Sequence, residues 1–296
     1  MKVPYFNLSL KYINNRGKIL KLMDEVGKTG NLLDGEYSKQ LGLSISKYLD
    51  KSYTVLVGSG TDALFFTLAS LPCKKVLLPA YSYLATATVM HRLPHMDFIF
   101  CDVDSNCLMD LDLADKLIYE HKCDCMVFVN LFGNPVNPNR LLEIKGKYPE
   151  LMIIEDGAQS IGAKWDSESQ HRASDIVTMS FDPTKAISGM GNGGSVSTNK
   201  AGLIERIEEW SRPGGGRGFH SRMDELDCAY AYLQLTELLP GYLSKRKEIA
   251  KKYNEAFKDL VSIPRCSSLL GEHAYLRYVI HFDTSKQRNE IMKHLN

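Results

Sequence analysis

Seven short apolar runs, each about as long as a β-strand, recur between residues 53 and 198 and constrain the fold more than any other feature. Stretches with helical periodicity, such as Thr61–Leu71 and Leu111–Glu120, lie between most of them. This alternation predicts a mostly parallel sheet with helices on both faces, because parallel strands need long crossover connections. The expected strands are Tyr53–Val57, Lys75–Leu78, Asp97–Cys101, Cys125–Asn130, Leu151–Glu155, Ile176–Ser180 and Gly194–Ser197.

The strand rhythm stops after Thr198, and the rest of the chain reads differently. The basic stretch at 244–252 has the composition of a solvated helix face. We therefore expect a large α/β domain over residues 1–240 and a small C-terminal α+β domain over 241–296. The elements predicted after residue 198 are a helix at Ala201–Trp210, a Gly-rich loop at 212–218, a long helix starting with the capping pattern of Ser221–Asp224, a strand at Tyr275–Phe282 and a final helix.

Charge and apolar patterning exclude several classes of protein. Lys plus Arg is 36 and Asp plus Glu is 35, so the net charge of +1 lacks the basic excess of a nucleic-acid binder. Apolar runs stay well short of the ~20 residues that span a membrane. The first residues lack the apolar core of a signal peptide, so we expect a cytoplasmic protein with neither nucleic acid nor membrane as partner.

Seven cysteines are scattered along the chain without any CxxC pair. Cys123 and Cys125 alternate within an apolar stretch and are expected to share one face of a strand. Reduced thiols in the core explain this pattern better than zinc ligands or disulfides do. We therefore expect no metal site.

Small residues follow the first predicted strand and open a helix, in the segment Gly58-Ser-Gly-Thr-Asp-Ala63. They let the backbone approach an anion, and the free N–H groups of a helix start bind phosphate. A tight strand-to-helix turn is the alternative interpretation. The segment also fits the dinucleotide pattern GxGxxA, but that fingerprint needs an acidic residue about 20 positions on. The next strand runs into Pro79-Ala-Tyr-Ser without an acid, which disfavours a Rossmann oxidoreductase.

Two further strand ends carry polar residues that suit chemistry. Glu155 and Asp156 end an apolar strand, where a carboxylate is costly unless a cation or hydrogen-bond donors meet it. Ser180 ends another strand and is followed by Lys185 and a Gly-rich turn, where a lysine can form a Schiff base. A phosphate cradle, a carboxylate for a pyridinium nitrogen and an amine for an aldehyde are together what pyridoxal 5′-phosphate (PLP) needs.

On these residues, the sequence resembles the DegT/DnrJ/EryC1/StrS sugar aminotransferases, which are fold-type-I PLP enzymes. The resemblance runs from Pro4 to the end of the chain. It implies a three-layer αβα fold with a mostly parallel seven-stranded sheet. The motifs that carry the resemblance are Val57–Leu64, Pro79–Thr86, Phe100–Asp104, Glu155–Gln159, Ser180–Lys185 and Gly218–Glu225.

The resemblance implies roles for particular side chains. Lys185 matches the Schiff-base lysine, and Asp156 matches the acid that faces the pyridine nitrogen. Gln159 matches the residue that bonds the cofactor's phenolic oxygen, and Tyr83 matches the aromatic that stacks on the ring. The residues matching the phosphate binders are Gly60, Thr61 and Ser180.

The resemblance also implies a homodimer with shared active sites, in which the loop before Ser221 reaches the partner's cofactor. His220 stands where the family usually has an Asn that touches the partner's PLP phosphate, and a histidine can also donate to phosphate. Asn192 replaces an acidic residue in the Gly-rich turn. Relatives continue past the segment at 275–282, so we expect the small C-terminal domain to be truncated here.

The implied activity moves an amino group from glutamate to a nucleotide-linked keto-sugar. A PLP-dependent sugar dehydratase is the nearest alternative, although those enzymes have histidine at the position of Lys185. A catalytically silent relative that binds PLP or a sugar nucleotide is a further alternative, supported by Asn192, His220 and the short C-terminus.

Overall fold

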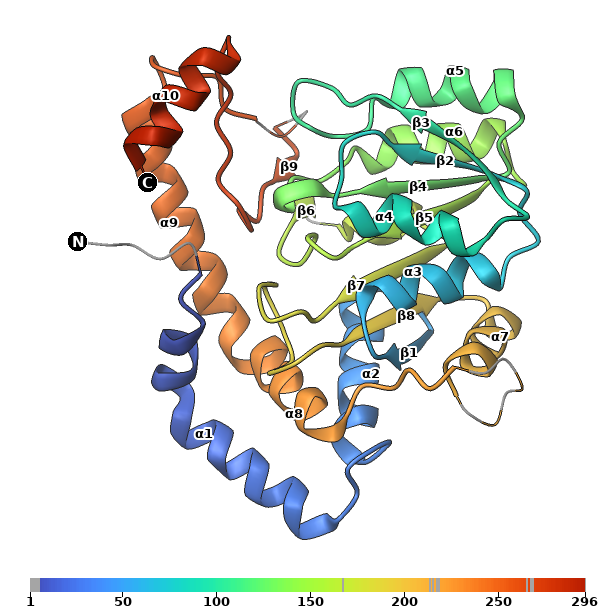
Figure 1. Cartoon of the computed structure of the whole chain (residues 1–296), viewed down its shortest axis with the longest axis vertical. Coiled ribbons are helices and arrows are strands. Elements are labelled where there is room, and N and C mark those ends of the chain that lie inside the picture. Colours follow the sequence, from blue (N-terminus) through green and yellow to red (C-terminus); the bar gives the residue numbers. More distant parts are fainter. Residues whose placement is uncertain are drawn as a thin grey trace.

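The computed structural model describes residues 6–295 except 167, 213, 215, 217, 218, 265, 267 and 268. Its centre is a seven-stranded sheet with the order β1-β8-β7-β5-β4-β2-β3 (Figure 1). A two-stranded ribbon of β6 (Lys164–Trp165) and β9 (Gly271–Glu272) lies apart from it. The strands of the main sheet are β1 (Tyr53–Val57), β2 (Lys75–Pro79), β3 (Asp97–Cys101), β4 (Cys125–Val129), β5 (Met152–Asp156), β7 (Ile176–Ser180) and β8 (Gly194–Thr198).

The sheet is mostly parallel, as the alternating pattern predicts. β8 pairs antiparallel with both β1 and β7, whereas the β7–β5, β5–β4, β4–β2 and β2–β3 pairs are parallel. All the strands except β8 therefore point the same way. Their carboxyl ends meet at one edge, which is where ligands bind in open α/β sheets.

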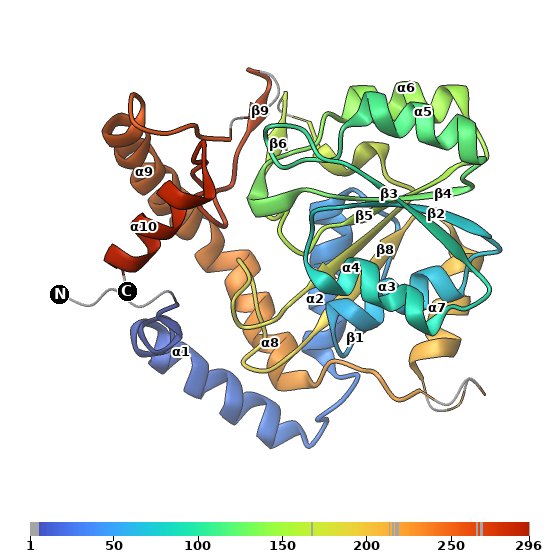
Figure 2. The ribbon, with the colours of Figure 1, turned by 45° about the horizontal axis from the view of Figure 1, so that its top comes forward.

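Helices cover both faces of the sheet and give three layers (Figure 2). One face packs against α3 (Gly60–Ala69) and α7 (Ala201–Ser211), with Val76, Val127 and Ile154 contributing from the strands. The other face packs against four helices in two groups. These are α5 (Leu111–His121) and α6 (Pro138–Lys147) over β2 to β5, and α2 (Glu36–Leu49) and α8 (Glu225–Leu233) over β7.

The remaining helices lie around this core. Gln234–Leu238 forms a π-type turn that joins α8 directly to α9, so a nearly continuous helix leads away from the sheet (Figure 1). The other elements are α1 (Leu8–Thr29), α4 (Leu84–Thr88), α9 (Leu239–Phe257), α10 (Ser285–Leu295) and short 3-10 turns at Val89–Arg92, Leu131–Gly133 and Gln170–Ala173. No helix in the described part of the chain is long and apolar enough to cross a membrane.

The start of α8 differs from the prediction. Asp224 caps this helix, and its side chain accepts a hydrogen bond from the backbone N–H of Asp227. Ser221 makes other contacts, because its hydroxyl donates to Asp62 Oδ2 at 2.7 Å and accepts from the backbone N–H of Gly58 at 2.9 Å. The S/T-x-x-D/E pattern therefore places the cap three residues too early.

The predicted strand at Tyr275–Phe282 is wrong. Tyr275 has a φ of 52°, which is incompatible with an extended strand. Ala274 N–H donates to the carbonyl of Gly133, and Arg277 N–H donates to that of Phe132. The segment therefore crosses the loop after β4 and joins no sheet, apart from a single bridge between Ser262 and His281.

The cysteines are free thiols, but Cys123 and Cys125 do not share a face as predicted. Cys125 begins β4 and packs on the α3 side of the sheet, whereas Cys123 precedes the strand and packs on the α5 side.

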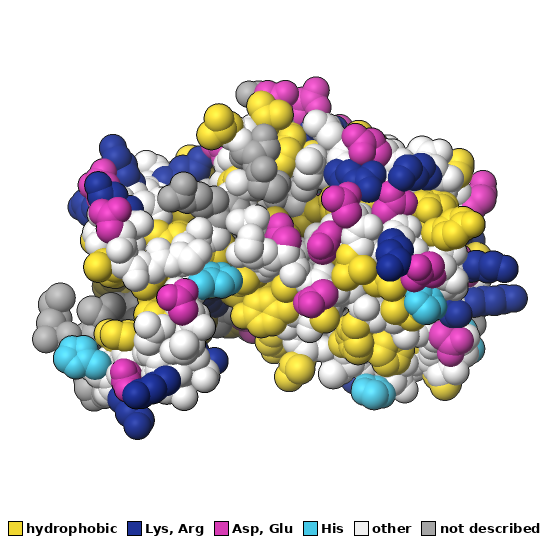
Figure 3. Space-filling view, turned by 90° about the horizontal axis from the view of Figure 1, so that it is seen from above, with side chains coloured by type: hydrophobic (Ala, Val, Ile, Leu, Met, Phe, Trp, Pro, Cys, Tyr) yellow, Lys and Arg dark blue, Asp and Glu magenta, His cyan; other side chains and the backbone are white. Residues whose placement is uncertain are grey.

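The helix predicted at Ala201–Trp210 is present as α7, and the predicted final helix is present as α10. The Gly-rich loop at 212–218 lies largely outside the described residues. On the face seen in Figure 3, acidic and basic side chains are interspersed, in keeping with the small net charge.

Candidate active site

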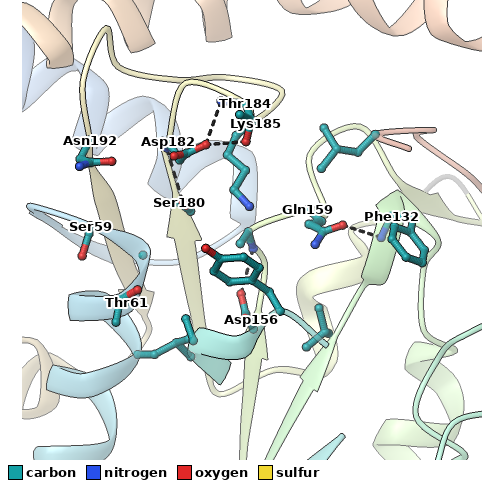
Figure 4. A pocket seen from close by; sticks show the side chains of 18 of the residues that line it. Ser59, Thr61, Phe132, Asp156, Gln159, Ser180, Asp182, Thr184, Lys185 and Asn192 are labelled. Carbon is teal, nitrogen blue, oxygen red and sulfur yellow. Dashed lines mark hydrogen bonds between the residues drawn. The ribbon is translucent and has the colours of Figure 1, made fainter. Parts of the chain in front are cut away.

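A cavity of about 610 Å³ opens where β1, β4, β5 and β7 end (Figure 4). Its lining includes all the site residues that the sequence predicts from within one chain. These are Gly60, Thr61, Tyr83, Asp156, Gln159, Ser180 and Lys185. His220 does not line it: this side chain is exposed, and its Nε2 lies 2.9 Å from Arg222 Nη2.

One wall of the cavity is the start of α3. Ser59 caps this helix, with its hydroxyl accepting from the backbone N–H of Asp62 at 3.1 Å. Gly60 leaves no room for a side chain, because a Cβ there would lie 2.7 Å from the Cβ of Ser180. The free N–H groups and the positive end of the helix dipole suit a phosphate. The absence of a side chain at Gly60 therefore lets the start of α3 pack closely against the end of β7.

The floor of the cavity is Asp156, at the end of β5 (Figure 4). Its side chain is buried and accepts a hydrogen bond from Thr86 Oγ1 at 2.8 Å. Burial raises the pKa of Asp156, and the contacts with Thr86, Ala158 N–H and Lys185 only partly oppose that shift. A cation next to the buried carboxylate, such as a protonated ring nitrogen, would stabilise its ionised form.

Lys185 extends from the turn after β7 into the middle of the cavity (Figure 4). Its Nζ lies 5.6 Å from the ring centroid of Tyr83. Burial and the nearby charge of Arg277 lower the pKa of Lys185, while Asp156 and Asp182 oppose the shift. A lowered pKa increases the neutral amine, which is the form that attacks an aldehyde or accepts a proton.

Gln159 is oriented by a strained loop. Its Oε1 accepts a hydrogen bond from the backbone N–H of Phe132 at 2.8 Å, which leaves the Nε2 end as a donor. Phe132 has φ 61° and ψ 3°, a left-handed conformation that is unfavourable for a bulky residue. Such strain commonly marks functional sites, and here the strained residue donates the hydrogen bond that orients Gln159.

Some residues in or next to the cavity have no role predicted from the sequence. Thr86 belongs to the Pro79–Thr86 motif and does not line the cavity itself, but the fold brings its hydroxyl to Asp156. Arg277 reaches the cavity because its segment crosses the loop at Phe132. Asn192 also lines the cavity, so the departure from the family pattern lies at the site itself.

The lining therefore fits pyridoxal phosphate: a helix start for its phosphate, a buried carboxylate, a lysine with a lowered pKa and an aromatic ring beside that lysine. An α/β fold with this set of groups defines the class of PLP-dependent transferases. The profile of the DegT/DnrJ/EryC1/StrS aminotransferase family matches residues 14–296, and the chain belongs to that family.

Curated relatives match most of the chain at low identity. A protein of Geobacillus stearothermophilus named pleiotropic regulatory protein is 28% identical over 279 residues, covering 90% of this chain and 74% of its own length. The dTDP-3-amino-3,4,6-trideoxy-alpha-D-glucose transaminase of Micromonospora megalomicea is 28% identical, covering 97% of this chain and 79% of its own. The 3-oxo-glucose-6-phosphate:glutamate aminotransferase of Bacillus subtilis is 27% identical, covering 100% and 69%.

Solved structures share the fold. A DegT/DnrJ/EryC1/StrS aminotransferase from Brucella abortus superposes with a TM-score of 0.86 at 25% identity, covering 99% of this chain and 82% of its own. The NtdA protein of Bacillus subtilis, solved with bound pyridoxamine phosphate (PMP), has a TM-score of 0.84 at 25% identity, covering 99% and 69%. The predicted fold class and cofactor are thereby confirmed.

Proposed function

We propose that this PLP-dependent aminotransferase takes its amino group from glutamate and delivers it to a nucleotide-linked keto-sugar. The observation that carries the activity is the placement of Lys185 beside Tyr83, above a buried Asp156 and next to the start of α3. The names of the relatives from Micromonospora and Bacillus support the sugar and glutamate assignments, because they specify a dTDP-sugar transaminase and a glutamate aminotransferase.

We assign a role in holding the cofactor to each predicted residue that lines the cavity. Gly60, Thr61 and Ser180 would bind its phosphate, and Asp156 would stay ionised opposite its protonated ring nitrogen. Tyr83 and Gln159 would hold the ring from its face and from its phenolic edge. When bound, pyridoxal phosphate supplies an aldehyde that takes the amino group and a ring that accepts the electrons of the broken C–H bond.

Lys185 is proposed as the group that moves the proton. Its amine, once free, would take a proton from the amino-bearing carbon of the donor and hold it for return during the transfer. With the keto-sugar as acceptor, Lys185 would move the proton in the opposite direction. The lowered pKa of Lys185 supports this role, because a base is most effective when its pKa lies near the working pH.

The homodimer and its shared site are part of the proposal. His220 is exposed and outside its own cavity, which suits a residue that serves the partner's phosphate. An equilibrium sedimentation measurement of the mass in solution tests the dimer. A His220→Ala variant that binds PLP as tightly as wild type would contradict the shared phosphate contact.

The activity is tested by the colour of the protein. A PLP enzyme absorbs in the visible region, loses that band with borohydride and converts to the pyridoxamine spectrum with glutamate. A panel of keto-sugar nucleotides then identifies the acceptor by return of the original spectrum. A protein that stays colourless with PLP would overturn the proposal, and one that is coloured but inert to amino donors would be a silent binding relative.

A further inference from the structure

A second cavity, of about 540 Å³, lies directly beside the first, between α1, α9 and the turn at Lys185. The residues that line both cavities are Phe6, Thr184, Lys185, Leu276 and Arg277. A ligand in the second cavity can therefore have one end next to the lysine. Nothing in the cofactor assignment uses this space.

The wall of the second cavity is basic. Lys11 from α1, Arg246 from α9 and Arg277 from the C-terminal segment line it, and we call these three residues the basic chamber. None of the described residues that line this cavity is acidic. Lys245 also lines it, but that amine already pairs with Glu248 at 2.8 Å on the outer side of α9.

The charged ends of Lys11 and Arg246 are partly withdrawn from solvent. Arg246 stands within the basic stretch that the sequence assigns to a solvated helix face, yet its Nη1 is buried. Within the described part of the chain, that atom has no hydrogen-bond partner. Lys11 Nζ donates to the neutral hydroxyl of Ser188 at 2.8 Å and lies 5.7 Å from the ring centroid of Tyr230.

Holding these cations together is costly. Burial and the charge of Arg246 lower the pKa of Lys11 to about 8. Burial also lowers the pKa of Arg246, and the charge of Arg277 adds to that effect. Like charges in a partly dry cavity destabilise the fold unless an anion joins them, so the arrangement indicates a ligand.

We propose that the basic chamber binds the phosphoryl groups of the amino acceptor, whose keto-sugar then faces Lys185. This inference rests on the proposed aminotransferase function and names the part of the substrate that the chamber recognises. Three cations match the two or more negative charges of a phosphate or diphosphate. The two carboxylates of the glutamate donor carry a similar charge, and the glutamate half-reaction measured below separates the two ligands. Either a sugar phosphate or a nucleotide-linked sugar would supply such a group.

The test uses the full chain loaded with PLP. The cofactor's phosphate then occupies the proposed site at Gly60, Thr61 and Ser180, so the added anion cannot bind there. Binding of inorganic pyrophosphate is measured by isothermal titration calorimetry for wild type, Arg246→Gln and Arg246→Lys. Lys251→Gln is the matched control, because it removes one charge from the exposed side of the same helix. The spectral half-reaction with glutamate is recorded for every variant.

We expect Arg246→Gln to weaken pyrophosphate binding by about tenfold or more, since hydrogen bonds to charged groups contribute at least that factor. Arg246→Lys should recover part of the affinity, which excludes misfolding as the cause. Lys251→Gln should stay within about twofold of wild type, as expected for a solvated charge. The rate of the glutamate half-reaction should stay within about twofold of wild type in Lys251→Gln, which is outside the chamber.

Equal pyrophosphate affinity of wild type and Arg246→Gln would overturn the inference. A weakened glutamate half-reaction with unchanged pyrophosphate affinity would instead assign the chamber to the donor's carboxylate. Failure of the proposed function looks different, because then no variant forms a coloured complex with PLP.

Two further ligands, UDP and inorganic phosphate, distinguish a nucleotide-linked sugar from a sugar phosphate. Either of the two results below supports binding of a phosphoryl group in the basic chamber. Tighter binding of UDP than of pyrophosphate, with the same loss in Arg246→Gln, indicates a nucleotide-linked acceptor. Binding of inorganic phosphate as tightly as UDP, again lost in Arg246→Gln, indicates a sugar phosphate.

Discussion

Thr86 Oγ1 donates a hydrogen bond of 2.8 Å to Asp156 Oδ2 and so joins α4 to the carboxylate on the floor of the active-site cavity. Burial raises the pKa of Asp156, and the hydrogen bond from Thr86 opposes this shift more than any other contact does. Asp156 has to be ionised to stabilise a protonated ring nitrogen in the proposed mechanism. In that mechanism Thr86 would be a positioning residue that acts through Asp156.

Thr86→Val should raise the pKa of Asp156 further, because a hydrogen bond to its charged form is lost. We expect the rate of the glutamate half-reaction to fall by about tenfold, the factor that corresponds to one charged hydrogen bond. The acid limb of the pH–rate profile should move to higher pH. Thr86→Ser keeps the hydroxyl and should restore both, whereas an unshifted profile in Thr86→Val would argue against this role.

Lys185→Ala should abolish turnover, because it removes both the amine that binds the cofactor aldehyde and the group that moves the proton. Loss of a general base alone slows a reaction by about 10²-fold to 10⁴-fold. The variant should still bind pyridoxamine phosphate, since Asp156 and the proposed phosphate-binding residues at the start of α3 are unchanged. Stopped-flow spectra and PMP titration measure the two effects, and wild-type-like turnover would contradict the assignment.

Gly60→Ala should weaken cofactor binding. The new Cβ would lie 2.7 Å from Ser180 Cβ and 3.2 Å from Ser180 Cα, so α3 or β7 has to move. We expect PLP affinity to fall by about tenfold or more, since the loss of well-aligned N–H donors to phosphate costs at least one charged hydrogen bond. Gly17→Ala is the control, because its Cβ meets nothing within 4 Å in α1.

The strands of the main sheet could be predicted closely because they are buried on both faces. Buried parallel strands read as short continuous apolar runs, and each predicted run overlaps the observed strand. The segment Tyr275–Phe282 is also mostly apolar, although Arg277 and His281 interrupt it, and its environment is different. Its backbone bonds the loop at Phe132 and Gly133, a contact between distant segments that composition does not encode.

Some site residues could likewise be predicted from their place in the sequence, whereas others depend on contacts between distant segments. Asp156 ends β5 and Lys185 follows β7, so topology alone brings them to one edge of the sheet. Arg246 could not be separated from its basic neighbours, because its inward direction depends on α1 packing beside α9. The division into domains 1–240 and 241–296 stays a prediction, since residue 241 falls inside α9 and no break in the helix marks it.

The basic chamber should lose affinity for anions as the pH rises. Lys11 has a pKa of about 8, so its positive charge declines between about pH 7 and pH 9. The groups that face its amine are Ser188 and Tyr230, with Tyr242 and Arg246 on the neighbouring helix. None of these gains a compensating positive charge as the pH rises, so pyrophosphate affinity should fall.

Lys11→Met isolates this effect. In the variant, pyrophosphate affinity should be lower at pH 7 and nearly constant up to pH 9, as measured by calorimetry with PLP-loaded protein. If the variant and wild type keep the same pH dependence, another group is responsible and the assignment to Lys11 fails.

The pair of Glu155 and His171 should matter for stability and little for the choice of substrate. Glu155 is fully buried on the face of the sheet opposite Asp156, with His171 Nδ1 at 2.9 Å and Asn130 Nδ2 at 2.7 Å. Burial alone would raise the pKa of Glu155, but its contacts with His171, Asn130 and Ser174 outweigh burial and lower it. The ionised form therefore stabilises the fold above the unfolded pKa, and that stabilisation is lost as the pH falls through the folded pKa.

Glu155→Gln removes one partner of this buried pair, and we expect it to lower the free energy of unfolding by about 3 kcal/mol at pH 7. Urea unfolding at pH 7 and at pH 4 measures the effect, and the difference between wild type and variant should shrink at the lower pH. Glu143→Gln, at an exposed pair with Arg140, should cost less than about 1 kcal/mol. A loss in Glu155→Gln no larger than in Glu143→Gln would mean that the buried carboxylate contributes nothing beyond a surface pair.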